Sequence, residues 1–160
     1  MTAPTPCTEW DVRTLINHLV GFSRITAASV TGGEMPDWGA QLVGDDPKPD
    51  FTDAARDAAA ALQGPAVMER TLKMPWGEMT GARLAEVLFM DLTIHSWDLA
   101  KATNQIDELD PDLCETALSL GQTMMTDEFR KPGRGFGPEV TVPADAPVCD
   151  RLAAFYGRQP

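Results

Sequence analysis

The sequence predicts an all-α fold, a helical bundle with short extended arms, and three observations lead to this prediction. Apolar residues recur at intervals of three and four over several long stretches. Residues typical of helix starts and helix ends bracket these stretches. Alternating or extended character is confined to residues 67–80 and 140–143. With 160 residues, the chain is expected to form one domain, 1–160, with a sizeable core.

Thr8 and Asp11 have the spacing of a capping box, which places Glu9 and Asp11 in the first turn of the first helix, and this helix is expected to end near Val30. Apolar residues recur in it at helical spacing, at Val12, Leu15, Ile16 and Leu19. His18 lies on the shoulder of this apolar stripe. The spacing alone favours a half-buried histidine that a neighbour satisfies, and a role as a ligand stays open at this point.

A change of composition to Gly, Pro and acidic residues predicts a long loop over residues 32–50. Trp38 gives this loop apolar surface, together with Met35 and Leu42. A lid that folds back over the bundle and a loosely held connector are therefore both open interpretations. An Ala-rich second helix is expected over residues 51–62, with small side chains that suit a close neighbouring helix.

The second half of the chain is expected to contain three more helices. Residues 67–80 alternate around a Pro-Trp-Gly turn, which predicts a short hairpin or an extended arm before a third helix over 81–103. A fourth helix, 111–125, has Asp110 as its cap, and a terminal helix covers 146–155. The basic, Gly-rich turn 131–138 lacks the spacing of a phosphate-binding loop.

The charge balance excludes two classes of partner. The formal net charge is -11, which argues against a sequence-independent grip on nucleic acid and against docking on an anionic membrane. No apolar run approaches the roughly 20 residues that span a bilayer. The first residues, MTAPTP, lack the basic and apolar regions of a signal peptide. We therefore expect a cytoplasmic protein.

The three cysteines, Cys7, Cys114 and Cys149, are odd in number and widely spaced. This arrangement predicts neither a disulfide framework nor a Cys-x-x-Cys metal knuckle, and the cysteines are expected to be packing residues or surface thiols. Any metal ion would then be held by histidine and carboxylate side chains. The chain has only two histidines, His18 and His95, so the possible sites are few.

The third predicted helix has polar residues where its apolar face requires apolar ones. Asp91, His95 and Asp98 fall in the middle of the face that carries Leu84, Leu88 and Leu92. Residues i and i+4 point the same way, so Asp91 and His95 can meet at a common point. Burying them is costly unless they are paired, either by a metal ion or by a plain Asp–His hydrogen bond.

Bundle cores are places where side chains from facing helices form metal sites. His18 from one helix, with Asp91 and His95 from another, would make a set of two imidazoles and one carboxylate. Three protein ligands leave one position for water or substrate, which is the catalytic pattern of zinc. The same set could also hold nickel, iron or manganese.

Three separated motifs resemble a known family. Residues 5–21 (TPCTEWDVRTLINHLVG) resemble the metal-ligand helix of the DinB-like superfamily, and residues 91–100 (DLTIHSWDLA) its second ligand motif. Residues 136–147 and 150–160 are similar to the end of many actinobacterial members. The resemblance is closest to the branch of the N-terminal domain of mycothiol-dependent maleylpyruvate isomerase. It implies a DinB-like four-helix bundle with His18, Asp91 and His95 at the metal positions.

Two departures from the family pattern carry expectations of their own. The isomerase has Glu where this chain has Asp91, and a shorter side chain can change the coordination distance and the preferred metal. Members usually have another helix before the TPCTEW segment, with which this chain nearly begins. A bundle without that helix would expose an apolar groove, so we expect a homodimer or repacked helices.

The resemblance implies a metal-dependent transferase or isomerase that uses a low-molecular-weight thiol such as mycothiol. A divalent ion, most simply Zn²⁺, can bind a thiol and present it as a thiolate. Asp98 is expected as the catalytic residue, either orienting His95 or accepting a proton, with pairing to Arg24, Lys101 or a backbone group as its alternative. Arg151 and Arg158 could meet an anionic substrate, although terminal arginines are more often solvated. The alternatives are a metal-binding protein without catalysis and a helical interaction domain without metal.

Overall fold

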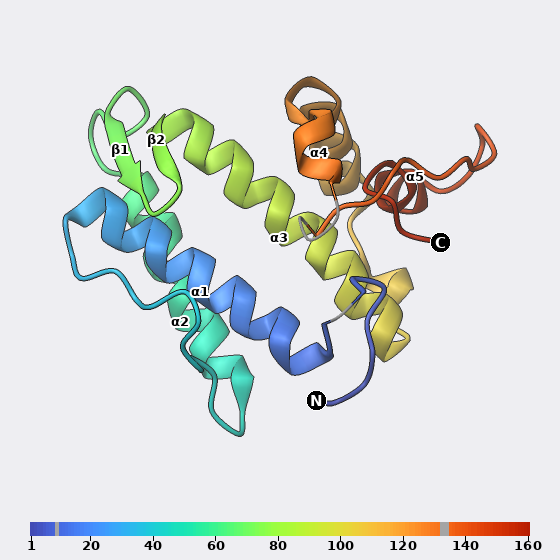
Figure 1. Ribbon diagram of the computed structural model, residues 1–160, viewed down its shortest axis with the longest axis horizontal. Helices are drawn as coiled ribbons and strands as arrows, with labels where there is room; N and C mark the ends of the chain where they lie inside the picture. The colour runs from blue at the N-terminus through green and yellow to red at the C-terminus, as the bar shows by residue number, and fades with distance from the viewer. Residues whose placement is uncertain (9, 132–134) are drawn as a thin grey trace. The chain divides into compact units, whose positions relative to one another are not determined.

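The computed structural model describes residues 1–8, 10–131 and 135–160, and it confirms the mostly α-helical prediction (Figure 1). In chain order, the elements are α1 (Val12–Thr31), α2 (Pro47–Leu62), β1 (Thr71–Met74), β2 (Gly77–Thr80), α3 (Gly81–Thr103), η1 (Ile106–Glu108), α4 (Pro111–Met124), η2 (Asp127–Arg130) and α5 (Val148–Phe155). Within the described part of the chain, no helix combines enough length and apolar character to cross a bilayer. Part of the predicted basic turn, residues 132–134, lies outside the described residues.

The residues form two compact units. The terminal unit consists of Met1–Val12 and Met90–Pro160, and the middle unit consists of Arg13–Phe89. The division falls near the start of α1 and within α3, so the two units share these helices.

In the middle unit, α1 and α2 enclose a small apolar core. Val20, Val43 and Ala54 are its buried residues. The alanines of α2 let the helix approach closely, as the sequence predicts, and Ala54 is only 3% exposed. The start of α2 was predicted wrongly, because the helix begins at Pro47 rather than Phe51. The Asp46 side chain accepts a hydrogen bond from the Lys48 amide and caps a helix that has proline in its first turn.

The long loop after α1 is held against that helix. The Asn17 side chain donates to the Ala40 carbonyl at 3.0 Å and accepts from the Leu42 amide at 2.6 Å. Arg13 donates to the Gly44 carbonyl at 3.0 Å. These bonds favour the folded-back loop over the loosely held connector. The predicted hairpin is confirmed, with β1 and β2 antiparallel.

The terminal unit contains α4 and α5, which pack on each other. A disulfide between Cys114 of α4 and Cys149 of α5 joins the two helices, so the prediction that the cysteines form no disulfide is wrong for this pair. The two cysteines are 35 residues apart, and only the packing of the two helices brings their Cα atoms to 5.1 Å. Cys7 is buried and is not part of a disulfide.

Candidate functional site

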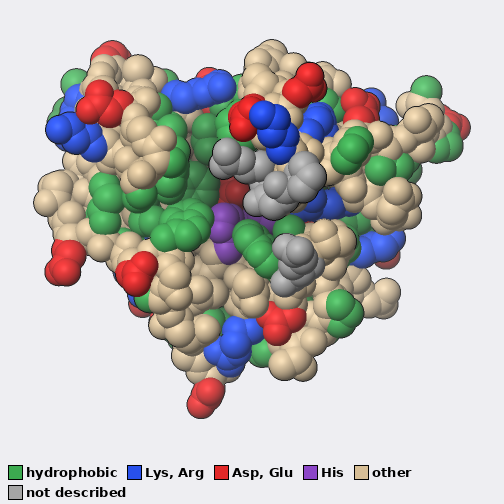
Figure 2. All heavy atoms as spheres, viewed as in Figure 1, with side chains coloured by type: hydrophobic (Ala, Val, Ile, Leu, Met, Phe, Trp, Pro, Cys, Tyr) green, Lys and Arg blue, Asp and Glu red, His purple; other side chains and the backbone are tan. Residues whose placement is uncertain are grey.

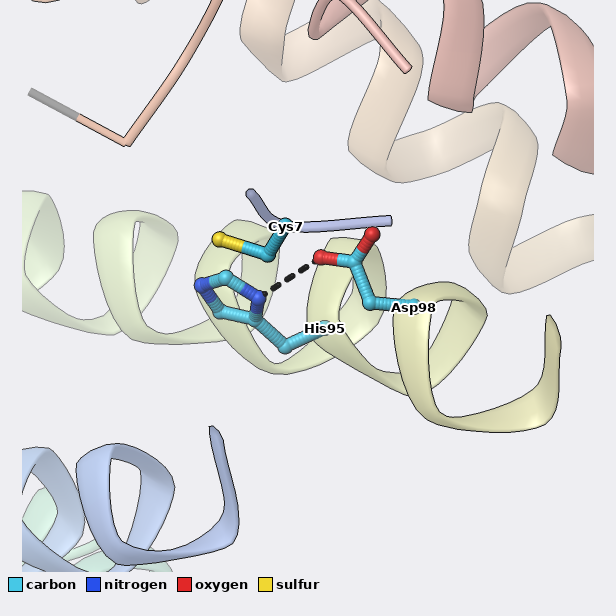
Figure 3. Close-up of side chains that lie close together, drawn as sticks. All are labelled: Cys7, His95 and Asp98. Carbon is cyan, nitrogen blue, oxygen red and sulfur yellow. Dashed lines mark hydrogen bonds and ion pairs between the residues drawn. The ribbon is translucent and has the colours of Figure 1, made fainter. Parts of the chain in front are cut away.

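His95 of α3 lies between two carboxylates of the same helix. Its Nδ1 atom is 2.9 Å from Asp98 Oδ2, and its Nε2 atom is 3.6 Å from Asp91 Oδ1 (Figure 3 shows the first of these pairs). The spacings i+3 and i−4 place both acids on the same helical face as the ring. The His95 side chain is only 3% exposed and that of Asp91 is 14% exposed. Each nitrogen of the imidazole therefore faces a different carboxylate.

Asp98 is fully buried and is paired with Arg158 near the end of the chain. Arg158 Nε donates to Asp98 Oδ1 at 3.0 Å, and Arg158 Nη2 donates to Oδ2 at 3.0 Å. This two-pronged pair supplies the positive charge that a buried carboxylate needs. The sequence analysis gave pairing with Arg24, Lys101 or a backbone group as the alternative role of Asp98, and it expected a solvated Arg158. Both expectations are wrong, since Arg158 is 4% exposed and binds Asp98.

The Asp98–Arg158 pair determines which nitrogen of the His95 ring donates to Asp98. A carboxylate bound to a guanidinium is an acceptor only, so the hydrogen bond to Asp98 requires a proton on Nδ1 of His95. In the neutral ring, Nε2 then carries the lone pair. This atom is the one that faces Asp91.

The end of α5 directs Arg158 toward Asp98. The Arg158 amide donates to the Ala153 carbonyl and the Gly157 amide to the Ala154 carbonyl, which is the Schellman arrangement at a helix end. Gly157 has a φ of 83°, and a Cβ atom there would come within 2.5 Å of the Gly137 backbone. Glycine is therefore required at this turn. The sequence indicated where the helix ends, but not that the following side chain turns inward.

The charge of Asp91 affects the pKa of Tyr156, which belongs to the same unit. The Tyr156 hydroxyl is buried and donates to the Met90 sulfur at 3.4 Å. Burial is the largest cause that raises the pKa of Tyr156 from 10.0 to about 12. The negative charge of Asp91 also raises this pKa, whereas Arg130 lowers it. Tyr156 therefore stays neutral beside the carboxylate at ordinary pH.

The N-terminal segment adds two residues that the sequence analysis did not assign to the site. The Trp10 ring lies 5.4 Å from the His95 ring, with 31° between their planes. Cys7 is 2% exposed, and the possible ligand atoms of Cys7, His95 and Asp98 all lie within 4.8 Å of one another. Both residues belong to the TPCTEW motif that carried the family resemblance. No spacing rule connects that motif with the helix bearing His95, which is far along the chain.

His18 belongs to the middle unit, where aromatic rings surround it. Its ring is 5.6 Å from Trp38, edge to face, and 6.3 Å from Phe22. Trp38 and Trp76 are 50% and 47% exposed and lie 5.4 Å apart. Figure 2 shows exposed hydrophobic side chains over α1 and the β1–β2 hairpin. Of the four predicted site residues, Asp91, His95 and Asp98 thus come together in the terminal unit, and His18 is described by its neighbours in the middle unit.

The side chains around His95 fit a divalent metal ion. Zinc lies about 2 Å from nitrogen and oxygen ligands, so two such ligands of one tetrahedral ion are about 3.4 Å apart. The 3.6 Å between His95 Nε2 and Asp91 Oδ1 is close to that spacing. A metal-binding histidine also characteristically donates its second nitrogen to a carboxylate, as His95 does to Asp98.

The comparisons with known proteins match a family model and two relatives to this chain. The model of the mycothiol maleylpyruvate isomerase N-terminal domain family matches residues 1–100, which include His18, Asp91, His95 and Asp98. Two proteins of Mycobacterium tuberculosis, the uncharacterized proteins MT0763 (strain CDC 1551 / Oshkosh) and Rv0738 (strain ATCC 25618 / H37Rv), are each 36% identical over 160 residues. The alignment covers 97% of this chain and 83% of each relative. No solved structure matches the chain.

Proposed function

The chain belongs to the mycothiol maleylpyruvate isomerase N-terminal domain family, and from this we propose that it binds a divalent metal ion through His18, Asp91 and His95. The proposed activity is a transferase or isomerase reaction in which a low-molecular-weight thiol such as mycothiol is the co-substrate. Zn²⁺ is the first candidate for the metal, and Ni²⁺, Fe²⁺ and Mn²⁺ suit the same ligand types. Because His18 and the pair Asp91–His95 lie in different units, the proposal requires the two units to bring them together.

One observation carries the proposal, namely the two-sided environment of the His95 ring. Asp98 holds the proton on Nδ1, and Nε2 faces Asp91 at near-ligand spacing. An isolated Asp–His hydrogen bond would need only one of these carboxylates. The second carboxylate beside a buried ring favours a cation between them.

The residues of the chain would divide the work as follows. A bound divalent ion would act as a Lewis acid that lowers the pKa of a thiol. Asp98 orients His95 and strengthens Nε2 as a donor, while Arg158 balances the charge of Asp98. Trp10 covers the ring and limits the access of water. The aromatic rings beside His18 offer apolar surface to the organic part of a substrate.

Metal analysis of untagged protein tests the proposal. We expect about one ion per wild-type chain and a large loss of ion in His95→Ala, His18→Ala and Asp91→Ala. Asp57→Asn, an exposed change on α2, is the control and should bind like wild type. Full metal content in His18→Ala would contradict the proposed ligand set. Wild-type protein without metal, even after incubation with each candidate ion, would refute the function.

The deep burial of His95 favours one alternative, a metal-binding protein without catalysis. A site closed by protein ligands would resist exchange, whereas a catalytic site should accept an added thiol. The Co²⁺ form, titrated with mycothiol, distinguishes the two, since direct thiol ligation changes its absorption spectrum. The proposal extends to a homodimer in the cytoplasm, and a monomeric mass by light scattering would contradict the dimer.

A further inference from the structure

Cys7 lies in a segment whose own hydrogen bonds fix its backbone. The Trp10 amide donates to the Cys7 carbonyl at 3.1 Å, and the Thr5 hydroxyl oxygen lies 3.2 Å from the same carbonyl. The Thr5 amide donates to the Trp10 carbonyl at 3.2 Å, and Pro4 pairs with Asp11 in an isolated bridge. This local network holds the buried Cys7 side chain against α3.

The sulfur of Cys7 lies beside the Nε2 edge of the His95 ring. Figure 3 shows it on the side of the ring nitrogen that does not bond to Asp98. The possible ligand atoms of this cluster lie within 4.8 Å of one another. A thiolate and an imidazole on one tetrahedral zinc ion are about 3.6 Å apart, given a zinc–sulfur distance of about 2.3 Å.

Asp98, the third member of the cluster, is already paired with Arg158. Both oxygens of Asp98 accept hydrogen bonds from Arg158, and Oδ2 also accepts from His95. If Asp98 bound a metal ion instead, the buried guanidinium of Arg158 would lose its anion, which is strongly unfavourable. The donors that this cluster offers to a metal are therefore Cys7 Sγ and His95 Nε2.

We propose that Cys7 is a thiolate ligand of the metal ion bound at His95. The inference rests on the proposed metal function and deepens it, because it assigns the position that His18, Asp91 and His95 leave open. A thiol from solution must then displace Cys7 or enlarge the coordination of the ion. The chain thereby carries its own sulfur at the point where a thiol co-substrate would bind.

Cobalt spectroscopy of the full chain tests this assignment. A thiolate bound to Co²⁺ gives an intense charge-transfer band in the near ultraviolet, which imidazole and carboxylate ligands do not give. We expect the band in wild type, its complete loss in Cys7→Ser, and its retention in the double variant Cys114→Ser/Cys149→Ser. In the double variant Cys7 is the last of the three cysteines, so this variant decides the question even if Cys7→Ser fails to fold.

The outcomes separate the two proposals. Cobalt bound with visible ligand-field bands but without the charge-transfer band in the double variant would overturn the assignment of Cys7 and leave the His/Asp metal site standing. A band that persists in folded Cys7→Ser would also overturn it. Failure of wild type to bind cobalt or zinc would overturn both.

Discussion

The two histidines of the chain lie in opposite kinds of surroundings, one in each unit. His18 of the middle unit is surrounded by aromatic rings, among them the half-exposed Trp38. His95 of the terminal unit is buried and faces two carboxylates, one of which is neutralised by Arg158. The hydrogen bond to Asp98, whose carboxylate is held by Arg158, fixes the orientation of the His95 ring. The buried ion pair that orients His95 therefore belongs to the terminal unit.

Substitution of Arg158 is expected to cause the largest loss of stability, and it tests the difference between the two histidines. Arg158→Ala leaves Asp98 buried without a partner, and we expect a loss of about 3–5 kcal/mol in the free energy of unfolding. Arg70→Ala in the middle unit is the matched control. Arg70 is exposed and its guanidinium donates to the neutral Val30 carbonyl, so a loss of about 1 kcal/mol in the free energy of unfolding is expected. Urea unfolding measures both variants.

Equal losses in the two arginine variants would contradict the special role of the terminal unit. The double variant Arg158→Met/Asp98→Leu sharpens the result, since replacing both charges by apolar groups should recover most of the stability. Although its stability recovers, this double variant should bind metal more weakly than wild type, because His95 would lose the acceptor that orients it.

The disulfide is the next largest difference, because it lies entirely within the terminal unit. Reduction of Cys114–Cys149, a pair with a sequence separation of 35, should lower the stability of this unit by about 3–4 kcal/mol. Hydrogen exchange should become faster in α4 and α5 and stay unchanged in α2. A thiol count before and after reduction checks that the bond has been opened. Equal acceleration in α2 would show that the bond stabilises both units.

The smallest expected effect concerns Tyr156, the only tyrosine in the sequence. Its pKa is about 12 in the folded protein and 10.0 in the reference state, so the unfolded chain loses this proton first as the pH rises. Its contribution is complete below pH 10.0 and is lost toward pH 12, a change of roughly 2–3 kcal/mol. Tyr156→Phe should remove that part of the alkaline loss. Phenolate absorbance follows the single group directly, and a midpoint near 10 would refute the prediction.

The helices could largely be predicted from the sequence because their signals are local. The bounds of α3, Gly81–Thr103, agree with its apolar periodicity, and α4 begins at Pro111 with Asp110 as its cap, as expected. The start of α2 was missed because the Gly- and Pro-rich composition around it concealed a local Asp-Pro cap.

The contacts within the site needed the folded structure. Asp91, His95 and Asp98 were identified because one helix carries them all. Arg158 lies 60 residues from Asp98, and Cys7 reaches His95 from the other end of the chain. Helical periodicity carries no information about such distant pairs, and charge alone could not single out Arg158 among the 13 basic residues.

The Schellman turn at Gly157 has a consequence for how members of this family can diverge. Residues 1–100 carry every proposed ligand, but Arg158 lies beyond them. Arg158, which follows the final helix, therefore acts on His95 indirectly, because it binds the Asp98 carboxylate that accepts the hydrogen bond from the ring. A substitution at position 158 can therefore alter the hydrogen bond that orients His95 without any change in residues 1–100.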